Sequence, residues 1–297
     1  MDWIFVVVPG VIWGASFLFI AEGLQAMAPM GVTFFRIAVG FATLSLVPAA
    51  RASIAADDRV KTAALGVLWL AFPLSMFPFA EQHVSSALAG MLSGATPLFT
   101  ALVAAALTRT SPSRRVALGL VIGFLGTVVI AWPGLRNEST GGQTAGIVMI
   151  LCACVSYAFA YTLAAPLQKR NGALPVIWRA QAVGLILTAP FGAPAVVRGH
   201  WTPVALGCLL ALGALGTGVA YAMLTIAAGR MDATRASANN FIIPTVSLVL
   251  GLTILHEQVS PISIAGAAVC LTGAWLIKPV ARASVAQAFR PASAGHL

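Results

Sequence analysis

Ten apolar runs follow one another along the 297 residues of this chain, and each is about as long as a bilayer is thick. A helix needs roughly 20 predominantly apolar residues to cross the hydrocarbon core of a membrane. The ten runs cover residues 3–21, 30–50, 60–80, 84–107, 115–132, 144–166, 174–196, 203–228, 233–255 and 261–278. Because a helix satisfies its own backbone polar groups in lipid, these runs predict an all-α integral membrane protein with ten transmembrane helices.

The composition agrees with a multi-pass membrane protein. Hydrophobic residues make up 59% of the chain and charged residues only 8%, whereas a soluble domain carries about a quarter charged residues. The net charge of +9 would suit a nucleic-acid-binding protein, but the basic residues stand in short clusters between apolar runs. That distribution is typical of membrane orientation, and no nucleic-acid partner is expected.

The positions of Lys and Arg predict which side of the membrane each loop occupies. With a cytoplasmic N-terminus, cytoplasmic segments hold thirteen of the 17 basic residues, and the outer segments hold Arg136 and Arg198. Such a bias predicts a bacterial-type inner (plasma) membrane protein with both termini in the cytoplasm and a cytoplasmic tail at 280–297. Arg36 and Arg179 lie inside apolar runs near a helix start, where a long side chain can extend to the interface, so both are expected to be structural.

One face of the ninth run is polar and contains a helix breaker. Steps of three and four residues place its members on the same side of a helix: Ser237, Asn240, Pro244, Ser247 and Gly251. Subtracting 147 gives a similar face in the fourth run: Gly90, Ser93, Pro97, Thr100 and Ala104. Lipid cannot satisfy an amide or a freed carbonyl, so both faces are expected to meet protein or a watery cavity.

The offset of 147 also relates glycines of the fifth and tenth runs, Gly119 to Gly266 and Gly126 to Gly273. The sequence therefore predicts two repeats, 1–135 and 144–279, each with five membrane spans. An odd number of spans requires that the two halves insert in opposite directions. Inverted repeats with a central site near the midplane are typical of transporters, and the glycines would allow close helix packing.

Several motifs of the two halves resemble one transporter family. They are Trp13-Gly14-Ala15-Ser16, Thr33-Phe34-Phe35-Arg36, Val84-Ser85-Ser86-Ala87 before Thr96-Pro97, Ile243-Pro244, and His256-Glu257. The chain resembles the drug/metabolite transporter superfamily of the EamA type, and within it the YddG-type exporters of aromatic and other neutral amino acids. The resemblance implies alternating access around a central cavity lined by runs 1, 3, 4, 6, 8 and 9. The family's loop glutamate corresponds to Glu257, whereas Thr110 stands there in the first half.

Candidate substrate-binding residues lie on the runs that would line this cavity. They are Trp13, Ser16, Ser93, Tyr157, Tyr161, Tyr221, Asn239 and Asn240. Aromatic rings could hold an apolar side chain, and buried hydroxyl and amide groups need partners, which a substrate or a neighbouring helix could supply. Pro97 and Pro244 are expected to act as gating points, because a proline inside a helix removes a hydrogen bond. Glu257 is expected to cap the helix that begins at Ser260-Pro261.

The absence of some sequence features limits the possible mechanisms. No run has an acidic residue near its middle, so facilitated diffusion is favoured over a proton-driven pump. The chain has no catalytic set and no phosphate-binding loop, so no enzyme activity, cofactor or ATPase partner is expected. Cys152, Cys154, Cys208 and Cys270 stand in apolar runs without nearby histidines, and no metal is expected.

The sequence thus predicts an exporter of neutral or aromatic amino acids, or similar small metabolites, whose partners are the substrate and membrane lipid. Export of drugs or hydrophobic cations is the alternative within transport. An integral-membrane enzyme acting on lipids is the alternative from another class, although the acidic or histidine pair that it would need is missing.

Overall fold

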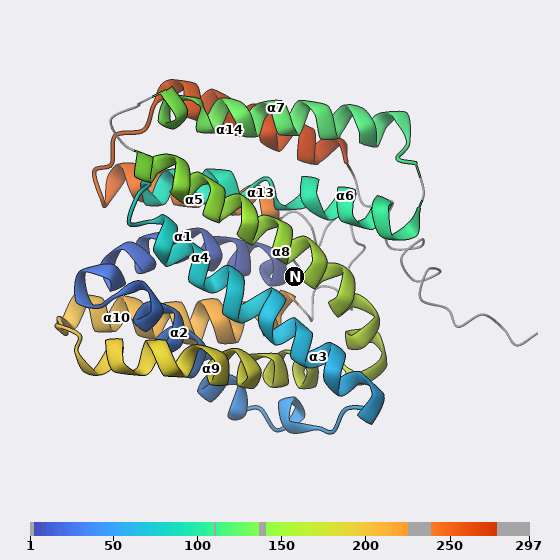
Figure 1. Cartoon of the computed structure of the whole chain (residues 1–297), viewed down its shortest axis with the longest axis vertical. Coiled ribbons are helices and arrows are strands. Elements are labelled where there is room, and N and C mark those ends of the chain that lie inside the picture. The colour runs from blue at the N-terminus through green and yellow to red at the C-terminus, as the bar shows by residue number, and fades with distance from the viewer. Residues whose placement is uncertain (1–2, 110, 137–140, 225–238, 278–297) are drawn as a thin grey trace, which may run out of the picture.

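The computed structural model describes residues 3–109, 111–136, 141–224 and 239–277. These residues form helices joined by short connections (Figure 1). The longer helices are α1 (Ile4–Ala26), α2 (Pro29–Ser45), α4 (Phe72–Ala80), α5 (Ser86–Ser93), α6 (Thr96–Thr108), α7 (Arg114–Arg136), α8 (Gly141–Asn171), α9 (Ala173–Val197), α10 (Pro203–Ala211), α13 (Asn239–Thr253) and α14 (Pro261–Leu276). Short 3-10 helices, η1 (Pro48–Arg51) and η2 (Ala56–Asp58), lead from α2 into α3 (Arg59–Leu65).

The lengths and composition of these helices are those of a multi-pass membrane protein. Seven continuous helical stretches are long and apolar enough to cross a bilayer. Three shorter apolar helices, at Pro29–Ser45, Phe241–Thr253 and Pro261–Leu276, account for the other three predicted runs. Ser237 and the tail at 280–297 lie outside the described residues.

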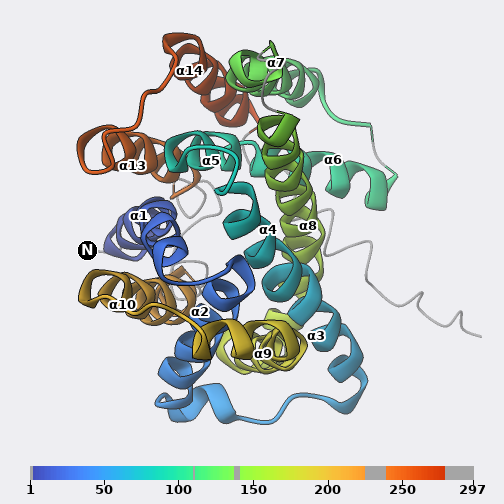
Figure 2. The same cartoon turned by 60° about the vertical axis from the view of Figure 1, so that its left-hand side comes forward.

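The bundle has an extensively packed helix pair at each end, and the helix contacts between these two pairs are less extensive. α7 packs along α14 at one end, and α2 packs along α9 at the other (Figures 1 and 2). Gly126 makes the first pairing close, because an added Cβ would lie 2.7 Å from the Cα of Cys270 and 2.8 Å from the carbonyl oxygen of Gly266. The predicted packing role of these glycines is confirmed.

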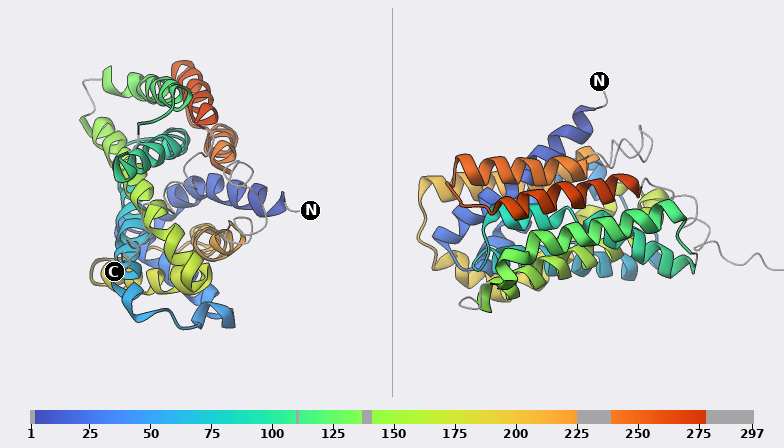
Figure 3. Two further views of the ribbon diagram at one scale, coloured as in Figure 1. Left: turned by 90° about the vertical axis from the view of Figure 1, so that its right-hand side faces the viewer. Right: turned by 90° about the horizontal axis from the view of Figure 1, so that it is seen from above.

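Helix contacts occur in corresponding pairs, as expected for two repeated halves. α1 packs against α13. α8, which is the counterpart of α1 in the second half, packs against α6. α2 packs against the π-helix η4 (Leu212–Val219), and α9 packs against the π-helix η3 (Gly66–Ala71). The first and second helices of each half, which are α1, α2, α8 and α9, therefore contact the other half. The central helices lie between the two end pairs (Figure 3).

The offset of 147 residues also appears in unusual backbone geometry. Gly66, the first residue of η3, corresponds to Gly213 near the start of η4. Arg109 and His256, likewise 147 apart, are the non-glycine residues with positive φ in the described chain, at 51° and 52°. Each follows an apolar helix of its half, so the repeat extends to single-residue conformations.

The two prolines of the repeated face differ in their structural setting. Pro244 lies inside α13, as expected. Pro97 is the second residue of α6, where a proline's missing N–H costs nothing, because the first N–H groups of a helix have no intrahelical partner. The fourth run breaks just before it, at Gly94 and Ala95, between α5 and α6. An interruption directly before Pro97 agrees with a bend of the fourth run at this proline, and its gating role stays a prediction.

Glu257 caps a different helix from the one expected. Its carboxylate oxygens accept hydrogen bonds from the backbone N–H groups of Ser86 and Ala87, at 2.7 and 2.9 Å, in the first turn of α5. The N-terminus of α14 is capped by Ser260 instead, whose hydroxyl accepts from the N–H of Ile262. Glu257 does act as a helix cap, as predicted, but it caps α5 and not α14.

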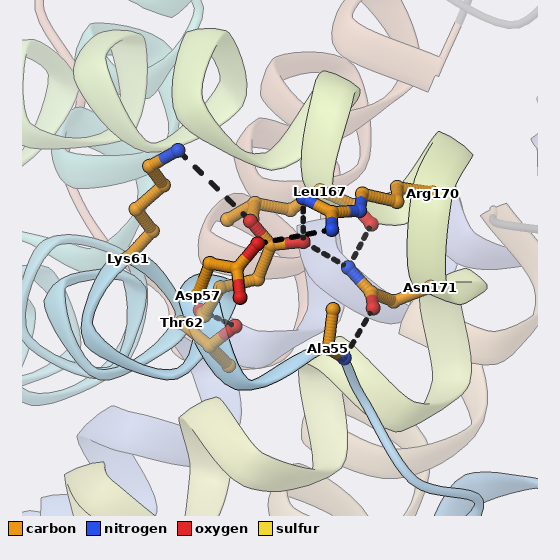
Figure 4. A network of polar contacts seen from close by, with 8 residues as sticks. Ala55, Asp57, Lys61, Thr62, Leu167, Arg170 and Asn171 are labelled. Carbon is orange, nitrogen blue, oxygen red and sulfur yellow. Dashed lines mark hydrogen bonds and ion pairs between the residues drawn. The ribbon is translucent and has the colours of Figure 1, made fainter.

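A polar clasp ties the start of α3 to the end of α8 (Figure 4). Asp58 is 2% exposed, and its carboxylate accepts a hydrogen bond of 2.8 Å from the side-chain amide of Asn171. Arg170 pairs with the same carboxylate at 3.4 Å and with the exposed Asp57 at 3.2 Å. The Asn171 amide oxygen also accepts from the N–H of Ala55, so this clasp holds the two halves together at one end of the bundle.

Candidate functional site

A cavity of about 80 Å³ lies between the two halves. Its wall is drawn from α1, α2, α4, α5, α6, α8, α13 and the helical residues after η4. The lining residues are Trp13, Ser16, Phe17, Ile20, Arg36, Leu74, Phe77, Ser93, Thr96, Tyr157, Tyr161, Tyr221 and Ile243. Ligand pockets usually measure about 300 to 1,000 Å³, so a metabolite would fit only after the surrounding helices or side chains move.

Aromatic rings from both halves form a continuous set around this cavity. Trp13 and Tyr221 meet edge to face, with ring centroids 5.4 Å apart. Phe77, Tyr157 and Tyr161 form a stacked row with centroid separations of 6.1 Å. Such rings present large apolar faces together with a few hydroxyl groups, which suits a ligand with an apolar or aromatic part.

Trp69, which is not among the lining residues, contacts two of these tyrosines. Its ring lies 5.6 Å from that of Tyr161 and 5.4 Å from that of Tyr221, edge to face in both cases. Trp69 is 5% exposed, and its indole N–H has no hydrogen-bond partner. Trp69 therefore supports the aromatic wall through its contacts with these two rings.

Carbonyl groups of the π-helices anchor side chains from the opposite half. The indole N–H of Trp13 donates to the carbonyl of Gly216 in η4, at 2.8 Å. In the corresponding contact, the hydroxyl of Ser156 in α8 donates to the carbonyl of Leu68 in η3, at 2.7 Å. A π turn frees carbonyl groups from the ordinary helical pattern and is frequent at functional sites, which explains how these two bonds can form.

Arg36 is buried in the wall of the cavity, so its predicted interfacial role was wrong. It is 4% exposed, and its Nε donates to the hydroxyl oxygen of Thr217 at 3.2 Å. α2 packs closely against η4 and α9, which blocks the side chain's path to an interface. The distance of Arg36 from its helix start could not reveal this, because the path depends on neighbouring helices.

Arg179 behaves as expected for an interfacial arginine. It donates to the carbonyl oxygens of Ala52 and Pro175, at 2.8 and 3.2 Å, and its guanidinium lies 5.4 Å from the ring centroid of Trp178. It is not among the lining residues of the cavity.

Most of the predicted substrate-binding residues lie together. Six line the cavity: Trp13, Ser16, Ser93, Tyr157, Tyr161 and Tyr221. Asn239 is buried at the first residue of α13 and is not among the lining residues. The side chain of Asn240 lies outside the described part of the structure. Pro244 packs against Gly94, directly after α5, because an added Cβ on Gly94 would lie 2.9 Å from its Cγ.

Several cavity residues were missed by sequence reasoning. Phe17 follows Trp13 by four residues and shares its face, so helical spacing could have revealed it. Thr96 precedes Pro97 in one of the family motifs but was not predicted to bind substrate. Phe77 and Arg36 could be assigned to the cavity only from the structure, because the packing of other helices places them there. Among the described residues, no group of three or more His, Cys, Asp or Glu side chains could hold a metal ion.

The chain matches known membrane transporters along its length. The EamA-like transporter family model matches it twice, over residues 3–132 and 144–278. An "Uncharacterized transporter" of Archaeoglobus fulgidus is 25% identical over 93% of this chain and 98% of its own. A "Probable terminal-alkyne amino-acid exporter" of Streptantibioticus cattleyicolor is 26% identical over 90% of each chain. The "Uncharacterized transporter YcxC" of Bacillus subtilis is 26% identical over 88% of this chain and 87% of its own.

A solved structure, described as "Crystal structure of protein", has a similar fold. The two superpose with a TM-score of 0.63, over 95% of this chain and 98% of the other. Its sequence is 16% identical to this one, so the likeness concerns the fold alone.

Proposed function

Because the chain belongs to the EamA-like transporter family, we propose that it exports neutral or aromatic amino acids, or similar small metabolites, through the central cavity. The family consists of transporters and not of enzymes, so the alternative of a lipid-modifying enzyme is excluded. The observation that carries the proposal is the aromatic-lined cavity between the two repeated halves.

In this proposal, all ten apolar helices cross the membrane as two inverted halves, 1–135 and 144–279. The corresponding helix contacts and the shared backbone geometry of Arg109 and His256 support the repeat. The distribution of Lys and Arg supports cytoplasmic termini and an inner-membrane location.

The substrate assignment rests on the chemistry of the wall. Trp13, Tyr157, Tyr161 and Tyr221 offer ring faces and hydroxyl groups to one small volume. An aromatic or branched apolar side chain would be covered by these rings, while its polar end would meet the hydroxyl groups and Arg36. The name of the Streptantibioticus relative, an amino-acid exporter, agrees with this class.

Transport would proceed by alternating access. A cavity of about 80 Å³ does not admit an amino acid, so each half must move to open one side. The break between α5 and α6 and the proline inside α13 are points where helices can bend, since each lacks a regular backbone hydrogen bond. None of the described lining residues is acidic, which favours facilitated diffusion.

Efflux of hydrophobic cations is the second candidate. Aromatic walls also bind cations through their ring faces. Against it stands Arg36, the one charged side chain among the described lining residues, because its positive charge would repel a cation in a water-poor cavity.

Uptake into proteoliposomes tests the proposal. Purified protein should mediate saturable uptake of radiolabelled amino acids without a proton gradient, and Tyr157→Ala should weaken it. Flux of aromatic cations in place of amino acids would favour the second candidate. Absence of amino-acid flux in every condition would remove the substrate assignment, and flux only with a proton gradient would overturn facilitated diffusion.

A further inference from the structure

Arg36 carries a buried charge that forms no ion pair with any acidic side chain in the described part of the chain. The residue is 4% exposed, and its one hydrogen bond to another described residue is from Nε to the hydroxyl of Thr217. No described carboxylate lies within the 4.0 Å of an ion pair with it. A buried guanidinium is costly without an anionic partner and marks a functional position inside a membrane.

Glu81, directly after α4, is the carboxyl group that acts electrostatically on Arg36 among the described residues, although it forms no ion pair with it. Its carboxylate oxygens are buried and have no hydrogen-bond partner. Burial raises the pKa of the Glu81 carboxyl well above its usual range, and the charge of Glu257 raises it further. The charge of Arg36 lowers this pKa but does not outweigh the other two effects, so the uncharged acid is favoured and Glu81 is a poor counter-ion for Arg36.

The guanidinium lies beside polar groups of the cavity. A Cβ added to Gly216 would lie 3.1 Å from the hydroxyl oxygen of Ser16 and 3.8 Å from Nη2 of Arg36. The Ser16 hydroxyl and the guanidinium therefore approach the same point of η4, and both residues line the cavity. Nε is occupied by Thr217, and no hydrogen bond joins the terminal nitrogens of Arg36 to another described residue.

Part of the wall is apolar. It contains the rings of Phe17 and Phe77 and the side chains of Ile20 and Leu74. The wall of the cavity thus combines one cationic side chain and several hydroxyl groups with apolar and aromatic side chains. A molecule with one carboxylate and one apolar group would fit this division of chemistry.

We infer that the guanidinium of Arg36 binds the carboxylate of the transported molecule, and the choice of an amino acid as that molecule rests on the proposed function. The substrate then supplies the missing counter-ion. A planar carboxylate matches the forked donors of arginine, and a charge-assisted pair is stronger in a water-poor site. An analogue whose carboxylate is replaced by an amide leaves the guanidinium unpaired and is disfavoured.

Matched ligand pairs test this inference in proteoliposomes. Phenylalanine and phenylalaninamide form one pair, and benzoate and benzamide form a second pair without the amino group. Each would compete for uptake or binding with the protein and with three variants, Arg36→Gln, Arg36→Lys and Arg179→Gln. Detergent-solubilised variants are first checked for a monodisperse elution profile, and Arg36→Lys serves where Arg36→Gln does not fold.

The protein should prefer each carboxylate over its amide by roughly ten- to a hundredfold, the range of a hydrogen bond to a charged group. Arg36→Gln should abolish this ratio, and Arg36→Lys should reduce it, because an ammonium lacks the planar fork. Arg179→Gln should leave the ratio intact, since Arg179 is not among the cavity-lining residues.

The outcomes separate this inference from the proposed function. If benzoate binds better than benzamide through Arg36 but no amino acid is transported, the carboxylate site stands and the amino-acid assignment fails. If amino acids are transported but the ratio is absent, or survives in both Arg36 variants, the inference is overturned and the exporter stands. If no carboxylate in the panel binds, both are overturned.

Discussion

The carboxylate of Glu257 binds the backbone N–H of Ser86, 171 residues earlier in the chain, at 2.7 Å. The second oxygen receives the N–H of Ala87 at 2.9 Å, and the N–H of Glu257 donates to the carbonyl of Gly251. One side chain thus connects the end of α13 with the first turn of α5. Its negative charge also faces the positive end of the α5 helix dipole.

Replacing Glu257 should weaken the protein through this capping contact. Glu257→Ala removes both acceptors and should lower the free energy of unfolding by about 1 to 2 kcal/mol, the usual range for a helix cap. Glu257→Gln retains one acceptor and loses the charge, so an intermediate loss is expected. Thermal unfolding in detergent measures the effect, with Glu22→Gln as a control; equal midpoints for Glu257→Ala and the parent protein would contradict the capping role.

The clasp at Asp58 predicts different effects for two adjacent aspartates. Asp58→Ala removes a buried carboxylate with its hydrogen bond from Asn171 and its ion pair with Arg170, and should cost roughly 1 to 3 kcal/mol. The side chain of Asp57 is 75% exposed, and its pair with Arg170 is screened by water, so Asp57→Ala should leave stability unchanged. Unfolding midpoints of the two variants, measured side by side, test this difference. Equal shifts would refute the clasp as described.

The closeness of α7 and α14 predicts that Gly126 tolerates no side chain. Gly126→Ala would place a methyl group against the backbone of Cys270 and should destabilise the protein by more than about 1 kcal/mol. Gly207 provides the matched control, since an added Cβ there meets nothing within 4 Å. Gly207→Ala should be neutral or slightly stabilising, because alanine favours helix. Folded yield and thermal midpoint check both variants, and a harmless Gly126→Ala would disprove the tight contact.

The different positions of Pro97 and Pro244 predict different effects on transport. Pro244→Ala restores a backbone N–H inside α13 and should slow uptake several-fold without preventing folding, because the helix becomes stiffer. Pro97→Ala changes a position at the start of α6 and should have a smaller effect. Initial uptake rates in proteoliposomes compare the two. A rate unaltered by Pro244→Ala would remove the gating role from this residue.

The sequence predicted the features that depend on one segment at a time. The apolar runs, the repeated glycines and the shared face of Trp13 and Ser16 follow from local composition and helical spacing, and the structure contains them. Arg36 and Glu257 were assigned wrongly because their partners, Thr217 and Ser86, lie 181 and 171 residues away. For a long polar side chain, the packing of other helices decides between several reachable environments.

The small volume of the cavity has a consequence for the membrane as an electrical insulator. A space of about 80 Å³, lined largely by aromatic rings, holds at most a few water molecules, far fewer than a column across about 30 Å of hydrocarbon would need. Protons and hydrated ions need such a column to cross. We therefore expect the protein in this conformation to leave the transmembrane voltage intact, so that a cell can carry many copies of it without dissipating the ion gradients that drive its other transporters.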